Sequence, residues 1–348
     1  AGGYSTRIGT NIVTSNFETL IAQARASDPS FLKVERQALV NAAREHLEAH
    51  WATVRERHAS GESGHNVLRA LTQGADHVVR GIVDFGLAPL EKWRQVMGRV
   101  SVCALGGYGR GELSPCSDLD ICLLYEGQFD ADVEALNAFL VPFLWDIGFK
   151  TGYALHSVAE AYELCRTDPE VYTTYAQGRL LHGSTSPFSR LKLVLAGMRS
   201  STVADEVLAM ARRRERPAEL HESYRDLYAP EPNLKESVGG LRDYHAALWM
   251  IHLHHGQLTL DDLARLGYIS SDEHVELSEG LDFHWRARNE IHFHLRKPEN
   301  KLTYAIQQHL AVALGYGEAS QAAIARLMQD YYTAARRVRS LLRIAERI

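Results

Sequence analysis

Apolar residues in the first quarter of the chain recur at the three- and four-residue spacing of an amphipathic helix. The clearest run consists of Leu39, Ala43, Leu47 and Trp51. The pattern extends from Asn16 to about residue 95, and a segment rich in Gly and Ser at 59–64 interrupts it. The sequence therefore predicts a helical leader with one internal loop.

Shorter apolar runs follow and are typical of buried strands. Residues 100–105 and 118–125 are rich in Val, Ile, Leu and Cys, and residues 149–156 alternate apolar and polar positions. Between them, residues 131–147 return to helical spacing, and Gly148 is a suitable C-terminal cap. We expect Pro142 to kink or split that helix.

From Asp168, a predicted helix cap followed by Pro169, almost all of the remaining sequence has a helical pattern. We therefore predict an α/β (α+β) fold with a small mixed sheet. The predicted domains are a helical leader at 1–96, an α/β domain at 97–185 and a helical bundle at 186–348.

Composition narrows the possible functions. The net charge of −5 over 348 residues gives no general attraction to nucleic acid, and the arginine-rich segments 211–217 and 336–343 are interpreted as solvated helix faces. The four cysteines form no Cys-x-x-Cys pair, which indicates reduced thiols and a cytoplasmic location. No apolar run approaches the roughly 20 residues that a membrane-spanning helix needs.

The most informative segment is ALGGYGRGELSPCSDLDICLLY, residues 104–125. Its glycines, which include Gly106 and Gly107, let backbone N–H groups approach a phosphate closely. On a strand, Asp118 and Asp120 share one face, and two carboxylates side by side favour Mg²⁺ ligation. This pattern is typical of nucleotidyl or phosphoryl transfer with two metal ions.

Three segments carry a resemblance to a known family. GGYGRGELSPCSDLDICLL (106–124) resembles the nucleotidyltransferase motif of bacterial PII uridylyltransferases, within the polymerase-beta type of nucleotidyltransferase. NLKESVGGLRDYHAALW (233–249) and GLDFHWRARNEIHFHL (280–295) are similar to two later segments of the same family. The helical bundle at 186–348 accordingly resembles that family's associated helical domain, which is similar to HEPN domains.

The resemblance implies Mg²⁺-dependent transfer of UMP from UTP to a tyrosine of the PII signalling protein, with release of pyrophosphate. Asp118 and Asp120 would be catalytic and bind Mg²⁺, while Gly106 and Gly107 would hold the triphosphate. Two further residues that flank this site, Arg110 and Ser117, are candidate phosphate ligands. The hydrolase domain that removes UMP and the glutamine-sensing domains of the family have no counterpart here, so we expect transfer without removal.

The loop before residue 241 is a second candidate phosphate site. Gly239 and Gly240 precede a predicted helix, where free N–H groups favour anions, and Lys235 and Arg242 would reach the nucleotide. The alternative is a helix-entry turn in which Arg242 and Asp243 form a structural ion pair.

The third metal-binding carboxylate and the exact function remain open in the sequence. The third carboxylate that usually completes this fold is missing from 149–156, and Asp168 or Asp243 are candidate substitutes. Trp145, Trp249 and Trp285 are interpreted as core residues rather than base-stacking platforms. The alternative functions are a related transferase with another nucleotide or acceptor, such as an adenylyltransferase, and an inactive nucleotide-binding module.

Overall fold

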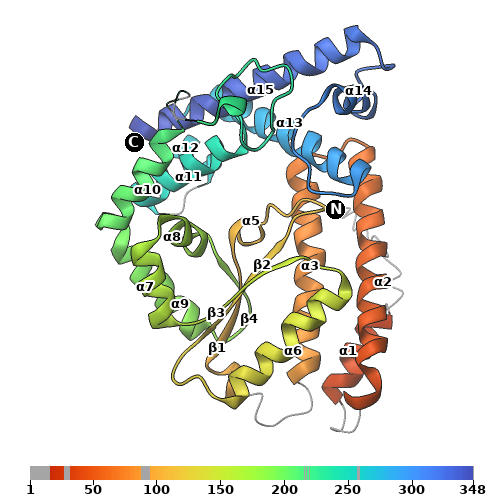
Figure 1. Ribbon diagram of the computed structural model, residues 1–348, viewed down its shortest axis with the longest axis vertical. Coiled ribbons are helices and arrows are strands. Elements are labelled where there is room, and N and C mark those ends of the chain that lie inside the picture. The colour runs from red at the N-terminus through yellow and green to blue at the C-terminus, as the bar shows by residue number, and fades with distance from the viewer. Residues whose placement is uncertain are drawn as a thin grey trace, which may run out of the picture.

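A computed structural model describes residues 16–26, 32–87, 95–214, 216, 218, 220–256 and 259–347 of the chain. Its four strands lie low in the centre of Figure 1, with helices on both sides of them and further helices arching across the top. No described helix has the length and apolar character needed to cross a membrane. The four cysteines are free thiols, as predicted.

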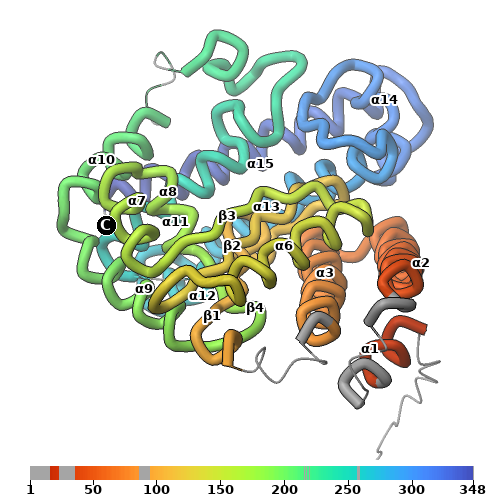
Figure 2. The backbone as a smooth tube through the Cα atoms, turned by 60° about the horizontal axis from the view of Figure 1, so that its bottom comes forward, coloured from red at the N-terminus to blue at the C-terminus, as the bar shows by residue number. Residues whose placement is uncertain are grey.

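The leader is helical, as its apolar spacing predicts. It consists of α1 (Asn16–Ala26), α2 (Leu32–Ala59) and α3 (Gly64–Leu87), and the interruption between α2 and α3 is the predicted loop. Figure 2 shows α2 and α3 side by side. Their buried side chains join one hydrophobic core with those of the sheet, so the leader packs as an integral layer on it.

The sheet contains the three predicted strands and a fourth that was not predicted. Its strands are β1 (Val100–Ala104), β2 (Leu119–Tyr125), β3 (Thr151–Ser157) and β4 (Arg179–Gly183), in the order β3-β2-β1-β4. β1 is antiparallel to β2 and β4, while β2 is parallel to β3. Strand β4 falls where the prediction was helical; it has only five residues, and its pairing with β1 determines its conformation.

Helix α6 (Ala131–Ile147) has the predicted boundaries, and Gly148 caps it with a φ of 107°. Of the predicted kink or split at Pro142, the split is wrong, since the helix is one continuous element. Pro142 and Ala138, one turn earlier, are both exposed. The carbonyl that loses its partner therefore lies on the solvent side, which lowers the cost of the missing hydrogen bond.

The opposite face of the sheet is covered by a second group of helices. They are α7 (Val158–Thr167), α8 (Pro169–Ala176), α9 (Thr185–Gly197), the single turn η2 (Met198–Ser200) and α10 (Thr202–Arg213). Alternate residues of β2 enter the two cores: Leu123 packs with the leader and α6, and Cys122 packs with this second group. The Asp168 side chain caps α8, with Pro169 first, as predicted.

The rest of the described chain is helical apart from its loops, as the sequence predicts. It contains η4 (Glu222–Tyr224), α11 (Leu241–His255), α12 (Leu260–Arg265), α13 (Ser271–Leu295), α14 (Tyr304–Ala313) and α15 (Gln321–Arg347). The long helix α15 crosses the top of the molecule and packs against α11 and α13 (Figure 1). This helical unit faces the end of the sheet that carries α5 (Gly106–Gly109), the glycine turn after β1.

Candidate functional site

A cavity of about 760 Å³ lies where the α/β unit meets the helical unit. Residues that are more than 100 positions apart in the chain form its wall. All eight residues selected from the sequence line it: Gly106, Gly107, Arg110, Ser117, Asp118, Asp120, Lys235 and Arg242. The structure thus brings the two candidate phosphate sites together in one cavity.

The Asp120 carboxylate lies against two glycines, and only a residue without a side chain fits at either position. A Cβ atom at Gly152, the β3 residue paired with Asp120, would lie 2.3 Å from Asp120 Oδ1. At Gly106, which has a φ of 54°, a Cβ would lie 2.6 Å from Asp120 Oδ2. No larger side chain fits at either position without displacing the carboxylate, so the turn and the strand are both shaped around it.

Asp118 and Asp120 line the cavity together, as predicted from their spacing. Strand β2 begins at Leu119, so Asp118 directly precedes it. Burial raises the pKa of Asp120, and the negative charge of Asp118 raises it further. A divalent cation between the two carboxylates would relieve this repulsion, and oxygen ligands suit Mg²⁺.

The pair is not a complete metal site by itself. Within the described ranges, no group of three or more His, Cys, Asp and Glu side chains is arranged to hold a metal ion. Mg²⁺ usually keeps waters and shares substrate phosphates in addition to one or two carboxylates. The two aspartates therefore fit an ion that arrives with a phosphate ligand.

Neither predicted substitute for a third carboxylate serves this cavity. The Asp168 side chain accepts hydrogen bonds from the backbone N–H groups of Glu170 and Val171, and Asp243 is fully buried in an ion-pair cluster. Three acids that the sequence analysis did not select also line the cavity: Glu112 and Glu236 are in ion pairs, and the third is Glu170, at the start of α8. Nothing in its sequence context distinguishes it from any acid in the first turn of a helix.

Two cations in the wall lack an acidic partner. In the part of the chain that the structure describes, neither Lys235 nor Arg288 is within ion-pair distance of a carboxylate. Burial lowers the pKa of Lys235, and the nearby charges of Arg242 and Arg288 lower it further. The cavity therefore has an excess of positive charge on its helical side.

Arg110 is held in place by a polar network that joins the two units. Its Nε donates to Glu112 at 2.8 Å, and its Nη1 donates to Gln177 at 3.0 Å. His245 Nε2, from α11, lies 2.8 Å from the same Glu112 oxygen, Oε2. Burial would raise the pKa of Glu112, but Arg110 and His245 together lower it to about 2. Glu112 is therefore ionised and positions Arg110 at the glycine turn.

The loop between Asn233 and Asp243 folds around internal hydrogen bonds. The Asn233 side chain accepts from the backbone N–H groups of Lys235 and Glu236, both at 2.9 Å. The Gly239 N–H donates to Asp243 at 2.7 Å, and the Gly240 N–H donates to the Ser237 carbonyl at 2.8 Å. The prediction that these two glycine N–H groups are free to bind phosphate is therefore wrong, because both already have acceptors, and that of Gly239 is the Asp243 carboxylate.

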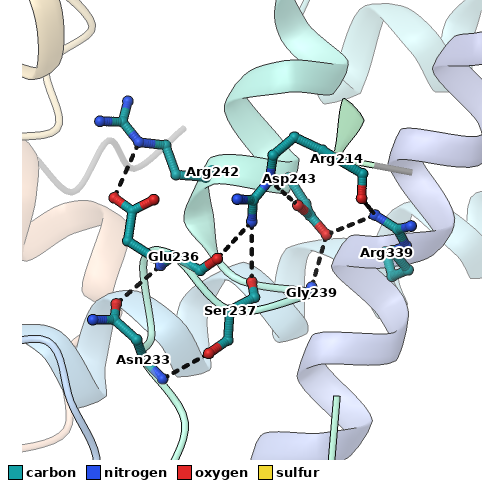
Figure 3. Close-up of polar contacts among 8 residues, drawn as sticks. All are labelled: Arg214, Asn233, Glu236, Ser237, Gly239, Arg242, Asp243 and Arg339. Carbon is teal, nitrogen blue, oxygen red and sulfur yellow. Dashed lines mark hydrogen bonds and ion pairs between the residues drawn. The ribbon is translucent and has the colours of Figure 1, made fainter. Parts of the chain in front are cut away.

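Asp243 is the centre of a buried cluster (Figure 3). Arg214 donates to one carboxylate oxygen at 2.7 Å, and Arg339 of α15 donates to the other at 3.1 Å. Arg242 points instead toward Glu236, at 3.3 Å, so the predicted alternative of an Arg242–Asp243 pair is also wrong. The interpretation of both arginine-rich segments as solvated faces fails at these two positions, because Arg214 and Arg339 turn inward to neutralise Asp243.

Of the three tryptophans interpreted as core residues, two are buried or partly buried and one is exposed. Trp285 is buried, and Trp249 is partly buried and donates its indole N–H to Gln177 at 3.2 Å. Both also line the cavity. Trp145 is 58% exposed, so its interpretation as a core residue is wrong.

Comparison with known proteins places these features in a family context. Residues 208–345 match the family model described as GlnD PII-uridylyltransferase. The chain is similar to the bifunctional uridylyltransferase/uridylyl-removing enzyme of Vibrio parahaemolyticus, at 37% identity over 243 residues, covering 70% of this chain and 28% of the relative. The Methylococcus capsulatus enzyme of the same name is 34% identical over 300 residues, 84% of this chain and 33% of the relative.

A third relative has the same name and a similar level of identity. The enzyme of the same name from Phenylobacterium zucineum is 31% identical over 298 residues, which is 83% of this chain and 31% of that protein. The chain therefore spans about a third or less of the length of the curated relatives it matches.

The Asp243 cluster yields a stability prediction. Asp243→Asn leaves Arg214 and Arg339 without their shared counter-charge in a buried position, so we expect the free energy of unfolding to fall by about 3–5 kcal/mol. Urea unfolding followed by circular dichroism measures it. Glu163→Gln, which breaks an exposed pair with Arg166 on α7, is the control and should leave the midpoint unchanged. Equal midpoints for Asp243→Asn and the unmodified chain would contradict the role given to the cluster.

Proposed function

Since this chain belongs to the GlnD PII-uridylyltransferase family, we propose that it transfers UMP from UTP to a tyrosine hydroxyl of a PII signalling protein. The observation that supports the proposal is the charge distribution of the cavity. The carboxylates of Asp118 and Asp120 line one part of it, and the unpaired cations of Lys235 and Arg288 line another.

A complex of a divalent cation with a triphosphate matches that distribution. Its metal ion would meet Asp118 and Asp120, and its phosphate oxygens would meet Lys235 and the glycine turn. Lys235 is close enough to lower the pKa of Asp120 electrostatically, yet the two side chains form no ion pair. The positive and negative groups thus face a common space without neutralising each other, which favours a ligand that carries both charges.

Each element would have a separate task in the reaction. Gly106 and Gly107 let backbone N–H groups approach the triphosphate, and Arg110 and Ser117 flank it. Asp118 and Asp120 would hold Mg²⁺, which when bound stabilises negative charge on the attacking and leaving oxygens. Catalysis would rest mainly on positioning and on charge neutralisation.

The proposed reaction balances as a displacement at the α-phosphorus. The tyrosine oxygen forms a bond to the α-phosphorus, and the bond from that phosphorus to the bridging oxygen of the β-phosphate breaks. Pyrophosphate leaves, and the hydroxyl proton passes to a base. Glu170 is a candidate for this base, since it is a carboxylate of the cavity wall for which the described residues provide no cationic partner.

Nucleotide transfer is the first test of this proposal. We expect label from UTP on a PII protein in the presence of Mg²⁺, and Asp118→Asn with Asp120→Asn should lower the rate by at least about 10²- to 10³-fold. Parallel reactions contain labelled ATP and, as a second acceptor, glutamine synthetase. Label from ATP alone would contradict the proposed nucleotide. Undiminished labelling by the double variant would exclude the two aspartates from the mechanism.

The two cations of the loop should differ in importance. Lys235 has no acidic partner among the described residues, whereas Arg242 is paired with Glu236 and 40% of its side chain is exposed. Lys235→Ala should weaken UTP binding by about 10- to 100-fold, and Arg242→Ala by less than about threefold. Titration calorimetry with UTP measures both. Unchanged affinity in both variants would remove this loop from the nucleotide site.

Metal binding should depend on pH through Asp120. Its pKa is raised, so its carboxylate gains a proton at a higher pH than an ordinary aspartate, and ion affinity should fall as the pH is lowered through that pKa. Mn²⁺ binding with a non-hydrolysable UTP analogue, followed by electron paramagnetic resonance between about pH 4 and pH 8, measures it. In Asp118→Asn the repulsion is absent, so the loss should move to lower pH. An identical pH profile in both proteins would contradict the proposed coupling.

A further inference from the structure

Arg288 has an environment unlike that of the other arginines in the cavity wall. Arg110, Arg214 and Arg242 each form an ion pair with an acidic side chain. Arg288 instead donates its Nε to the Asn300 side-chain oxygen at 2.8 Å and its Nη1 to the Ser114 hydroxyl at 2.7 Å. Both acceptors are neutral, so the described residues leave its charge without a direct partner.

The charged form of Arg288 is destabilised by its surroundings. Burial lowers the pKa of Arg288 to about 10, because a desolvated cation is destabilised, and the Arg110 and Arg242 charges act in the same direction. Glu112 acts in the opposite direction and more strongly than either arginine, but its carboxylate is paired with Arg110 and forms no ion pair with Arg288. An anion in the cavity would compensate this charge, and a guanidinium is well suited to the geometry of phosphate oxygens.

The position of Arg288 indicates which part of an anionic ligand it would meet. Ser114, its hydrogen-bond partner, lies in the segment between the glycine turn and the aspartate pair. The charged neighbours of Arg288 are Glu112, Arg110, Arg242 and Lys235. Those of Asp120 are Asp118, Arg110 and Lys235, and Arg288 is not among them. Arg288 therefore lies beside Lys235 but farther from the Asp120 carboxylate than Lys235 does, where the end of a triphosphate remote from the reacting phosphorus would lie.

We propose that Arg288 binds the β- and γ-phosphates of the nucleotide, and hence pyrophosphate after transfer. The residue belongs to α13, so the helical unit supplies part of the phosphate site that the glycine turn begins. The sequence analysis missed it because Arg288 lies within an ordinary helical pattern. Its distinction is a partly buried charge with no ion-pair partner among the described residues. This inference rests on the proposed function only for the identity of the nucleotide.

Calorimetric titration with inorganic pyrophosphate in the presence of Mg²⁺ tests the proposal on the whole chain. Arg288→Met should weaken pyrophosphate binding by about tenfold or more, because it removes a charge-assisted contact. UMP lacks the β- and γ-phosphates, so its affinity should stay within about twofold. Arg286→Met is the matched control, since Arg286 lies two residues away on α13 and lines an adjoining cavity instead. This variant should bind pyrophosphate like the unmodified chain.

The results of these titrations distinguish phosphate binding by Arg288 from a purely structural role of this residue. They also test Arg288 separately from the proposed transferase activity. Equal losses of UMP and pyrophosphate affinity in Arg288→Met would indicate a structural role and overturn the proposal, as would undiminished pyrophosphate binding. Arg288→Lys keeps the charge and a donor, so it provides a folded variant in which pyrophosphate binding should still weaken. If Arg288 proves necessary for pyrophosphate binding but no UMP is transferred, this proposal stands and the transferase proposal fails.

Discussion

The helical half of the cavity depends on the buried carboxylate of Asp243. It accepts hydrogen bonds from Arg214, at the end of α10, from Arg339 of α15 and from the backbone of Gly239. These contacts join three helices to the loop that carries Lys235 and leave that loop little freedom. The charges around Asp243 are balanced internally, whereas the charge of Lys235, on the same loop, remains available to a ligand. A structural ion-pair cluster thus holds in place the loop that carries Lys235, the cation proposed to bind phosphate.

The two units contribute opposite charges to one cavity. The sheet end supplies the carboxylates of Asp118 and Asp120, and the helical unit supplies Lys235 and Arg288. In the proposed function, the α/β unit would hold the metal ion and begin the phosphate site, and the helical unit would add the cations of Lys235 and Arg288 to it. The Glu112 carboxylate, which contacts Arg110 in its own unit and His245 in the other, fixes the two halves relative to each other. The proposed chemistry therefore depends on the docking of the units as much as on the motif itself.

The sequence was sufficient for the parts of the site that local pattern determines. The glycine turn and the spacing of Asp118 and Asp120 are local, and the structure places them together in one cavity. Strand β4 was missed because five residues are too few to show a period, and only pairing with β1 makes them a strand. The roles of Arg214, Arg339 and Arg288 depend on burial and on partners distant in the chain. One sequence contains no signal that separates them from solvated arginines.

The central claim is that one cavity holds a metal ion on the aspartate pair and phosphates on the cations of the helical unit. Crystals grown with Mn²⁺ and a non-hydrolysable UTP analogue test it directly, because anomalous scattering locates the ions. The account predicts a Mn²⁺ peak in contact with Asp118 and Asp120, with triphosphate oxygens between that peak and Lys235. A nucleotide bound elsewhere, or manganese away from both carboxylates, would contradict it.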